Sequence, residues 1–136
     1  MAEQESGWHG GKRINIMPWV FVALTVLFTV YGQIVIKWQV NQLDTGLPEG
    51  TLDKFVFVFR QYLNPWIISG LLSAFIASAS WIAAMTQLEL SKAYPFTSLA
   101  FIIVLFLSVF FFDESLTTAK VLGTVIILVG LYIIVR

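Results

Sequence analysis

Four polar residues recur at every fourth position through one long apolar segment of the chain. They are Thr25, Thr29, Gln33 and Lys37, and residues four apart on a helix lie along one slowly drifting face. Polar and ionisable groups are costly inside a membrane, so such a stripe favours a functional interpretation. The first three side chains of the stripe can form uncharged hydrogen bonds, and the last is a cation. This combination suits an anionic polar headgroup.

A simpler explanation covers part of this stripe. Lys37 can extend its ammonium group to water while its methylenes stay in lipid, and a threonine hydroxyl can bond the carbonyl one turn earlier. For Thr25 we expect that backbone bond, whereas for Lys37 both interpretations stand. No Asp or Glu lies in the long apolar segments of the sequence. A proton-coupled carrier would therefore lack its usual titratable carboxylate.

Further candidate residues lie in the second apolar segment and in the connection after it. The second segment is rich in small residues, which allow close helix packing or line a groove, and Trp81 is either a groove wall or a packing residue. In the connection, Lys92 either contacts a phosphate or only helps to set the orientation of the protein in the membrane. Glu89 pairs with Lys92 or acts at a cavity mouth, and Tyr94, followed by proline, interrupts or kinks the next helix.

These residues need membrane helices to position them. The chain has 136 residues, of which 58% are hydrophobic and 12% charged, more apolar surface than a soluble domain of this size can bury. A bilayer core of about 30 Å needs roughly 20 apolar residues per helix. We expect an all-α membrane protein with a four-helix transmembrane bundle over residues 17–136, after a soluble lead (1–16) that is no secretory signal. The expected spans are residues 18–37, 65–88, 94–112 and 119–135.

The connection between the first two expected spans is long and contains an amphipathic stretch. On a helix over residues 52–63, one face is apolar and the opposite face carries charged and amide side chains, a pattern typical of a helix lying in the membrane interface. The alternative is a loop whose apolar patch packs on the bundle. The apolar face would consist of Leu52, Phe55, Val56, Phe59 and Leu63.

Composition also excludes several classes of protein. Cysteine is absent, the single histidine is His9, and eight basic residues balance eight acidic ones. We therefore expect no metal, no cofactor and no nucleic-acid partner, and no catalytic constellation indicates an enzyme. The basic residues divide evenly between the two sides of the bundle, which leaves its orientation open.

The last apolar segment carries two glycines, Gly123 and Gly130, seven residues apart and so on one helix face. Such a pair indicates close helix contact within or between subunits, although membrane helices also tolerate isolated glycines. Because four helices barely enclose a polar path, we expect two units to combine around it.

Several stretches resemble the drug/metabolite transporter superfamily, in particular its small-multidrug-resistance-like branch. The stretches are NPWIISG, GQIVIK, ELSKAYPFTSLAFIIV and FFDESLTTAKVLGTVIILVGLYIIV. Within that branch the chain is most similar to flippase subunits for undecaprenyl-phosphate-linked aminoarabinose. Multidrug members carry a glutamate in span one where this chain has Thr29, which argues against proton-coupled drug export.

The resemblance implies a bacterial inner-membrane flippase without enzymatic activity, acting on a polyprenyl-phosphate-linked sugar or similar anionic lipid. It implies that Gly123 and Gly130 form a dimer face, with a second copy or a related small subunit, and that Tyr94 lines the substrate region. Alternatives are a small multidrug or metabolite exporter and an accessory subunit of a membrane glycosyltransferase. The candidate substrate-binding residues are Thr29, Gln33, Lys37, Trp81, Glu89, Lys92 and Tyr94.

Overall fold

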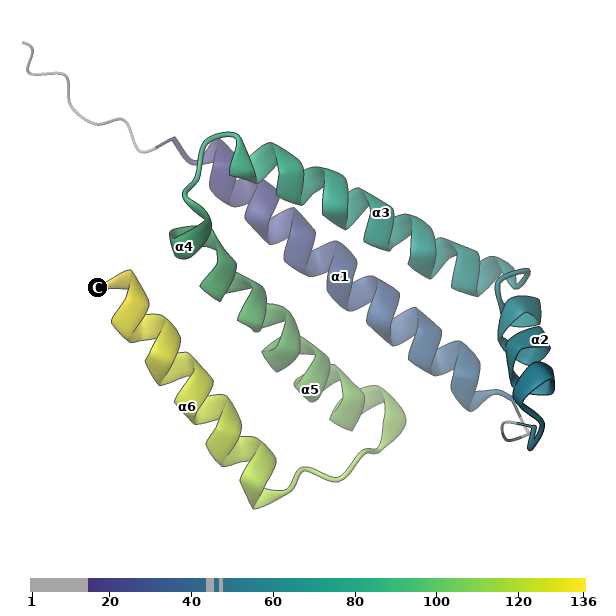
Figure 1. The fold of residues 1–136 in the computed structure, drawn as a ribbon. Helices are drawn as coiled ribbons and strands as arrows, with labels where there is room; N and C mark the ends of the chain where they lie inside the picture. The colour runs from purple at the N-terminus through teal and green to yellow at the C-terminus, as the bar shows by residue number, and fades with distance from the viewer. Residues whose placement is uncertain (1–14, 44–45, 47) are drawn as a thin grey trace, which may run out of the picture.

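The computed structural model describes residues 15–43, 46 and 48–136, and all regular structure within these ranges is helical (Figure 1). The expected soluble lead, residues 1–16, lies outside the described residues except for its last two. The elements are α1 (Met17–Asn41), α2 (Thr51–Gln61), α3 (Pro65–Met85), α4 (Leu90–Ala93), the short 3-10 helix η1 (Tyr94–Thr97), α5 (Ser98–Phe112) and α6 (Thr118–Val135).

The helices begin where capping residues and prolines predict. Pro18 and Pro65 occupy first-turn positions of α1 and α3, where no backbone N–H is needed. The Asn64 side chain accepts a hydrogen bond from the Trp66 N–H at 2.9 Å, and Thr117 caps α6 by accepting one from the Lys120 N–H at 3.3 Å.

The ends of the helices differ more from the sequence expectations. α1 continues about one turn past Lys37, to Asn41, because polar residues there do not interrupt helical hydrogen bonding. The predicted interruption at Tyr94 and Pro95 is present as η1, which separates α4 from α5. α5 ends at Asp113, whose φ of 52° lies in the left-handed region that aspartate tolerates better than most side chains.

Close packing of α1 against α3 forms the centre of the molecule, with α5 on the other side of α1 (Figure 1). A Cβ atom added at Gly32 would lie 2.8 Å from the Ser73 Oγ and 3.0 Å from the Gly70 carbonyl oxygen. Only glycine allows this approach. The packing interpretation of the small residues in the second segment is confirmed for the buried Ser73, Ala77, Ser80 and Ala84.

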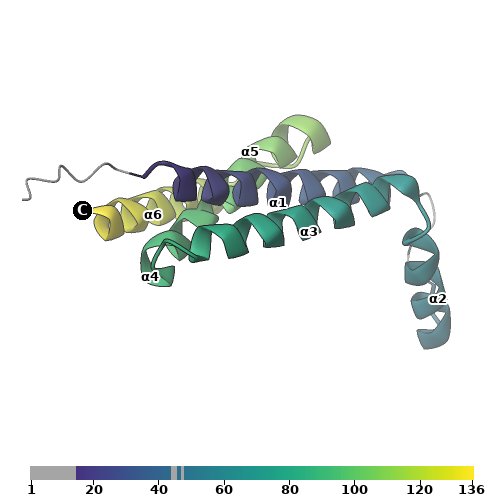
Figure 2. The same ribbon diagram turned by 90° about the horizontal axis from the view of Figure 1, so that it is seen from above.

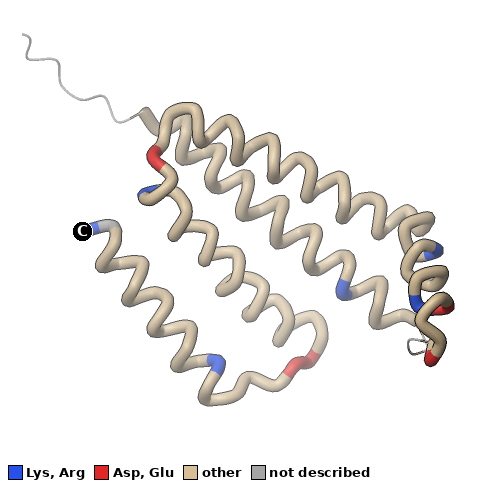
Figure 3. Tube along the Cα trace, in the orientation of Figure 1, with Lys and Arg blue, Asp and Glu red and all other residues tan. Residues whose placement is uncertain are grey.

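Among the described residues, three segments are long and apolar enough to cross a membrane, one fewer than expected. They are Met17–Asn41, Pro65–Met85 and Leu90–Phe112. α6 is equally apolar in character but shorter: its 18 residues span about 27 Å. Charged residues gather at the ends of the helices and on α2, away from the helix centres (Figure 3).

Aromatic pairs lie at both ends of the α1 helix. Trp38 and Trp66 meet edge to face at 5.4 Å near its C-terminal end, and Trp19 and Phe96 do so at 4.9 Å near its N-terminal end. Tryptophan is enriched at both membrane–water interfaces. The two pairs therefore mark the levels at which the bundle meets the headgroups.

Two helices stand apart from the α1–α3–α5 group. α6 lies at the outer edge and approaches the rest of the chain chiefly at η1. α2 leaves the α1–α3 pair at a steep angle (Figure 2). The predicted helix in the long connection is thus present, ending at Gln61 rather than 63.

Candidate functional site

A groove of about 300 Å³ lies between α1 and α3. The α1 wall carries three of the four stripe residues, Thr25, Thr29 and Gln33, together with Gly32 and Ile36. The α3 wall is built from small residues and Leu71, and Trp81 lines the groove near the C-terminal end of α3. The structure therefore brings Thr29, Gln33 and Trp81 together around one groove, whose lining is otherwise mostly apolar.

The polar groups in the groove differ in how far they are already satisfied. The Thr25 hydroxyl donates to the Phe21 carbonyl at 2.9 Å and lies 3.3 Å from the Ala77 carbonyl, as predicted for this residue. Within the described part of the chain, the Thr29 hydroxyl and the Gln33 amide have no hydrogen-bond partner. These two side chains are free to bond a guest in the groove.

Lys37 lies one turn beyond Gln33, outside the residues that line the groove. Its Nζ is 3.5 Å from Oε1 of Glu114, in the α5–α6 connection, and both side chains are partly exposed. Nothing local in the sequence predicts this contact between two residues so far apart in the chain. The cation of the stripe is therefore paired with a carboxylate at the end of the groove.

The remaining predicted site residues lie toward the other end of the bundle. The rings of Trp81 and Tyr94 meet edge to face at 6.1 Å. Lys92 pairs with Glu89 at 2.9 Å, so the predicted pairing is confirmed, and Lys92 shares a shallow pocket with Trp19. Trp19 and Lys37 are 18 residues apart on α1, about 27 Å. Lys37 and Lys92 are therefore not brought together.

The two glycines of α6 lie in open space. A Cβ atom added at Gly123 or Gly130 would meet nothing within 4 Å among the described residues. The glycines that pack inside this chain are instead Gly32 and Gly70, which the sequence expectations did not single out. The available signal was a glycine inside each of two apolar segments.

Comparison with known proteins places the chain in a family. The sequence profile of the EamA-like transporter family matches residues 13–136. The chain belongs to the EamA-like transporter family. This membership confirms the resemblance to the drug/metabolite transporter superfamily. No solved structure matches the chain.

Several relatives of this EamA-like chain share its length and nearly a third of its sequence. A protein of Serratia proteamaculans is 31% identical over 117 residues, covering 82% of this chain and 87% of the relative. One from Yersinia enterocolitica is 32% identical over 118 residues, 83% of this chain and 88% of the relative. Both are named probable 4-amino-4-deoxy-L-arabinose-phosphoundecaprenol flippase subunit ArnF.

Family membership and the apolar helices together define the class of this protein. EamA-like proteins are transporters, and the described residues include three candidate membrane spans. It is a multi-pass inner-membrane transporter rather than an enzyme.

Proposed function

We propose that the protein translocates an anionic, polyprenyl-phosphate-linked sugar across the bacterial inner membrane. The observation that carries this proposal is the groove between α1 and α3, in which Thr29 and Gln33 have no partner among the described residues. Phosphoundecaprenol-linked aminoarabinose, named for the Serratia and Yersinia relatives, is one substrate of this class.

The groove chemistry fits a sugar headgroup better than an apolar cation. Gln33 offers an amide donor and acceptor, and Thr29 a hydroxyl, which match the hydroxyl groups of a sugar. The small residues of α3 leave room, and the indole of Trp81 supplies a flat apolar wall. The headgroup would move along this path while the polyprenyl chain stays in the apolar phase.

The two lysines provide a cation for the phosphate at each end of this path. Lys37 and Lys92 lie at opposite ends of the bundle, and each is already paired with a carboxylate, Glu114 and Glu89 respectively. Lysine binds phosphate as a point charge. The phosphate would displace Glu114 from Lys37 on one side and Glu89 from Lys92 on the other.

The positions of the acidic residues give less support to the alternative function, which is multidrug or metabolite export. Proton–drug exchange needs a carboxylate that titrates inside the bundle. Glu89 is about two-thirds exposed and Glu114 about one-third, and both lie in connections rather than in spans. Substrate movement by rocking between two arrangements needs no such carboxylate in the groove.

The architecture we propose uses all four apolar helices. α6 would form a fourth span, since its length of about 27 Å approaches the bilayer core of about 30 Å. α2 would lie in the interface, because its steep angle to α3 (Figure 2) leaves the apolar side chains of one face exposed. Gly123 and Gly130 would face a second copy or a related small subunit.

Reconstitution tests the proposal directly. Purified protein in vesicles should translocate a short-chain polyprenyl-phosphate aminosugar faster than protein-free vesicles do. It should accumulate little of a quaternary-ammonium drug, with or without a pH gradient. Drug uptake driven by the gradient, without movement of the lipid, would favour export instead.

A further inference from the structure

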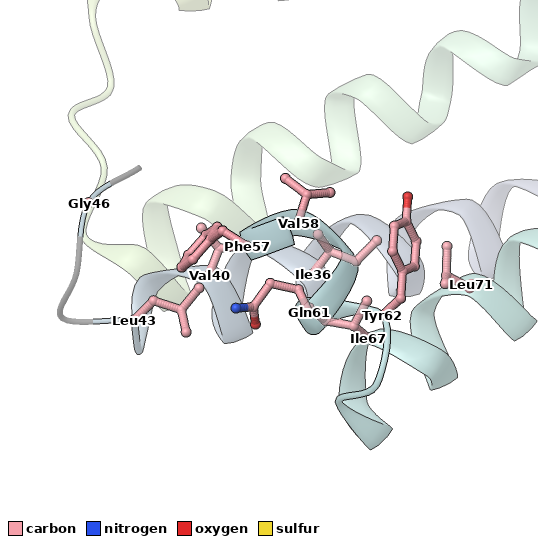
Figure 4. Close-up of a pocket in the computed structure, with 10 residues that line it drawn as sticks. All are labelled: Ile36, Val40, Leu43, Gly46, Phe57, Val58, Gln61, Tyr62, Ile67 and Leu71. Carbon is pink, nitrogen blue, oxygen red and sulfur yellow. The ribbon is translucent and has the colours of Figure 1, made fainter. Parts of the chain in front are cut away.

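A second, larger cavity lies under α2, which the proposed path of the headgroup does not use. Its volume is about 440 Å³, within the range of roughly 300–1,000 Å³ typical of small-ligand sites. Figure 4 shows its walls converging from α1, α2 and α3. Aliphatic and aromatic side chains dominate the lining, among them Ile36, Val40, Phe57, Val58, Ile67 and Leu71.

This apolar chamber adjoins the groove between α1 and α3. Ile36 and Leu71 line both cavities and therefore lie between them, and Gln33 is less than one helical turn from Ile36. A single amphipathic molecule that passes Ile36 and Leu71 can thus place a polar headgroup beside Gln33 and its first apolar segment under α2.

α2 uses one face to close the chamber and leaves another face free. Phe57 and Val58 point into the cavity (Figure 4), whereas Phe55 and Phe59 are 64% and 71% exposed. The free apolar face suits contact with the membrane interface. The chamber face is therefore separate from the general lipid-contacting face, and the two can be tested independently.

We infer that the chamber under α2 binds the first isoprenoid units of the lipid substrate, next to its phosphate. This inference rests on the proposed function and adds a tail-recognition site to it. An isoprenoid that leaves the bilayer gains little hydrophobic free energy, because lipid is equally apolar. The chamber therefore acts through shape: it accepts a methyl-branched chain and holds the attached headgroup beside Gln33.

The test uses the full-length protein in vesicles and two probes with the same sugar-phosphate headgroup. One probe carries a photoreactive diazirine in its first isoprenoid unit, and the other carries it in a saturated, unbranched chain. We expect the isoprenoid probe to label the segments 57–62 and 67–71, and the unbranched probe to label them about tenfold less or weaker still. Labelling confined to α5 and α6, or equal labelling by both probes, would overturn the inference.

Two matched variants test whether the chamber is used in transport. Val58→Trp fills the chamber, whereas Val56→Trp places the same indole on the exposed face of α2. Val58→Trp should slow isoprenoid translocation by about tenfold or more, and Val56→Trp should leave it within about twofold. Equal rates for both variants would contradict the inference, and wild-type labelling answers the question if Val58→Trp does not fold.

Failure of the two proposals can be distinguished. If wild-type protein moves the isoprenoid probe but the chamber is not labelled, only the tail site is wrong. If wild-type protein moves neither probe, the proposed function itself is wrong, and the tail site fails with it.

Discussion

At the scale of single residues, the polar stripe on α1 divides into satisfied and unsatisfied groups. The Thr25 hydroxyl already bonds the Phe21 carbonyl, while Gln33, two turns later, has no hydrogen-bond partner among the described residues. Regular spacing in the sequence makes these residues look equivalent. Their neighbours make them different, and of the two only Gln33 can donate a hydrogen bond to a guest without first losing one, whereas the Thr25 hydroxyl can still only accept.

Replacing Gln33 should impair transport far more than replacing Thr25. Gln33→Leu should lower lipid translocation roughly ten- to hundredfold, because a sugar hydroxyl in the groove would lose its partner. Thr25→Val should stay within about twofold. The effects of both substitutions are measured as rates of lipid translocation in vesicles that contain matched amounts of each protein. Equal effects of the two substitutions would contradict the assigned role of Gln33.

The Lys37–Glu114 ion pair predicts opposite effects for its two members. Glu114→Gln should tighten binding of a polyprenyl phosphate, because it removes the carboxylate that competes for Lys37. Lys37→Ala should weaken binding without loss of folded protein. Each change should be modest, roughly two- to fivefold, because the pair is partly exposed. Equilibrium binding of radiolabelled lipid to purified protein measures both, and changes in the same direction would exclude competition.

At the scale of helices, close packing of α1 and α3 sets the shape of the groove. Gly32 lies against Ser73 and Gly70, which holds the helix axes near each other and aligns the two walls. The groove is therefore a consequence of the small residues that α1 and α3 present to each other.

A side chain at Gly32 should separate these helices, whereas one at Gly123 should not. Gly32→Leu should destabilise the protomer by about 1–3 kcal/mol or more, because its Cβ alone would lie 2.8 Å from the Ser73 Oγ. Gly123→Leu is the matched control, since its Cβ meets nothing within 4 Å. Thermal unfolding of the protomer in detergent compares them. Similar losses of stability would show that α1 and α3 do not pack through Gly32.

Local sequence signals predicted the positions of the helices better than they predicted the contacts between helices. Asn64, Pro65 and Thr117 mark helix starts by chemistry that acts within a few residues, so these starts are visible in the sequence. The end of α1 was placed too early, because apolar content ended at Lys37 while the helix did not. The Gly32–Gly70 contact depends on how two helices rotate about each other, which local patterns do not specify.

At the scale of the whole molecule, α6 is a weakly packed helix that approaches the rest of the described chain chiefly at η1. Its exposed apolar residues, including Ile126 at 71% and Ile133 at 67%, lie beside two glycines with open space in front of them. A helix with this surface has area available both for lipid and for another helix.

Gly130→Leu should prevent assembly of two subunits through α6 while the protomer stays folded. Its Cβ meets nothing within 4 Å in the described part of the chain, but the added side chain would hold a facing helix away. Cross-linking and size-exclusion chromatography with light scattering, in detergent, report the oligomeric state. A variant that assembles like wild type would place the subunit interface elsewhere.

The candidate site was predictable in part. Thr29, Gln33 and Trp81 were expected around one groove, and the structure places them there. The pairing of Lys37 with Glu114 and the chamber under α2 were not foreseen, because each joins segments that are distant in the sequence. Periodicity along one helix predicts which residues share a face, and tertiary contacts decide what lies opposite that face.

The most direct test of the central claim is to block the groove and measure lipid translocation in vesicles. Ala74 lines the groove on α3, and Ala79, on the same helix, is exposed and lies outside the groove. Ala74→Trp should abolish movement of the polyprenyl-phosphate sugar, while Ala79→Trp should retain a rate near that of wild type. If folded Ala74→Trp protein moves the lipid as fast as Ala79→Trp protein does, the groove between α1 and α3 is not the path.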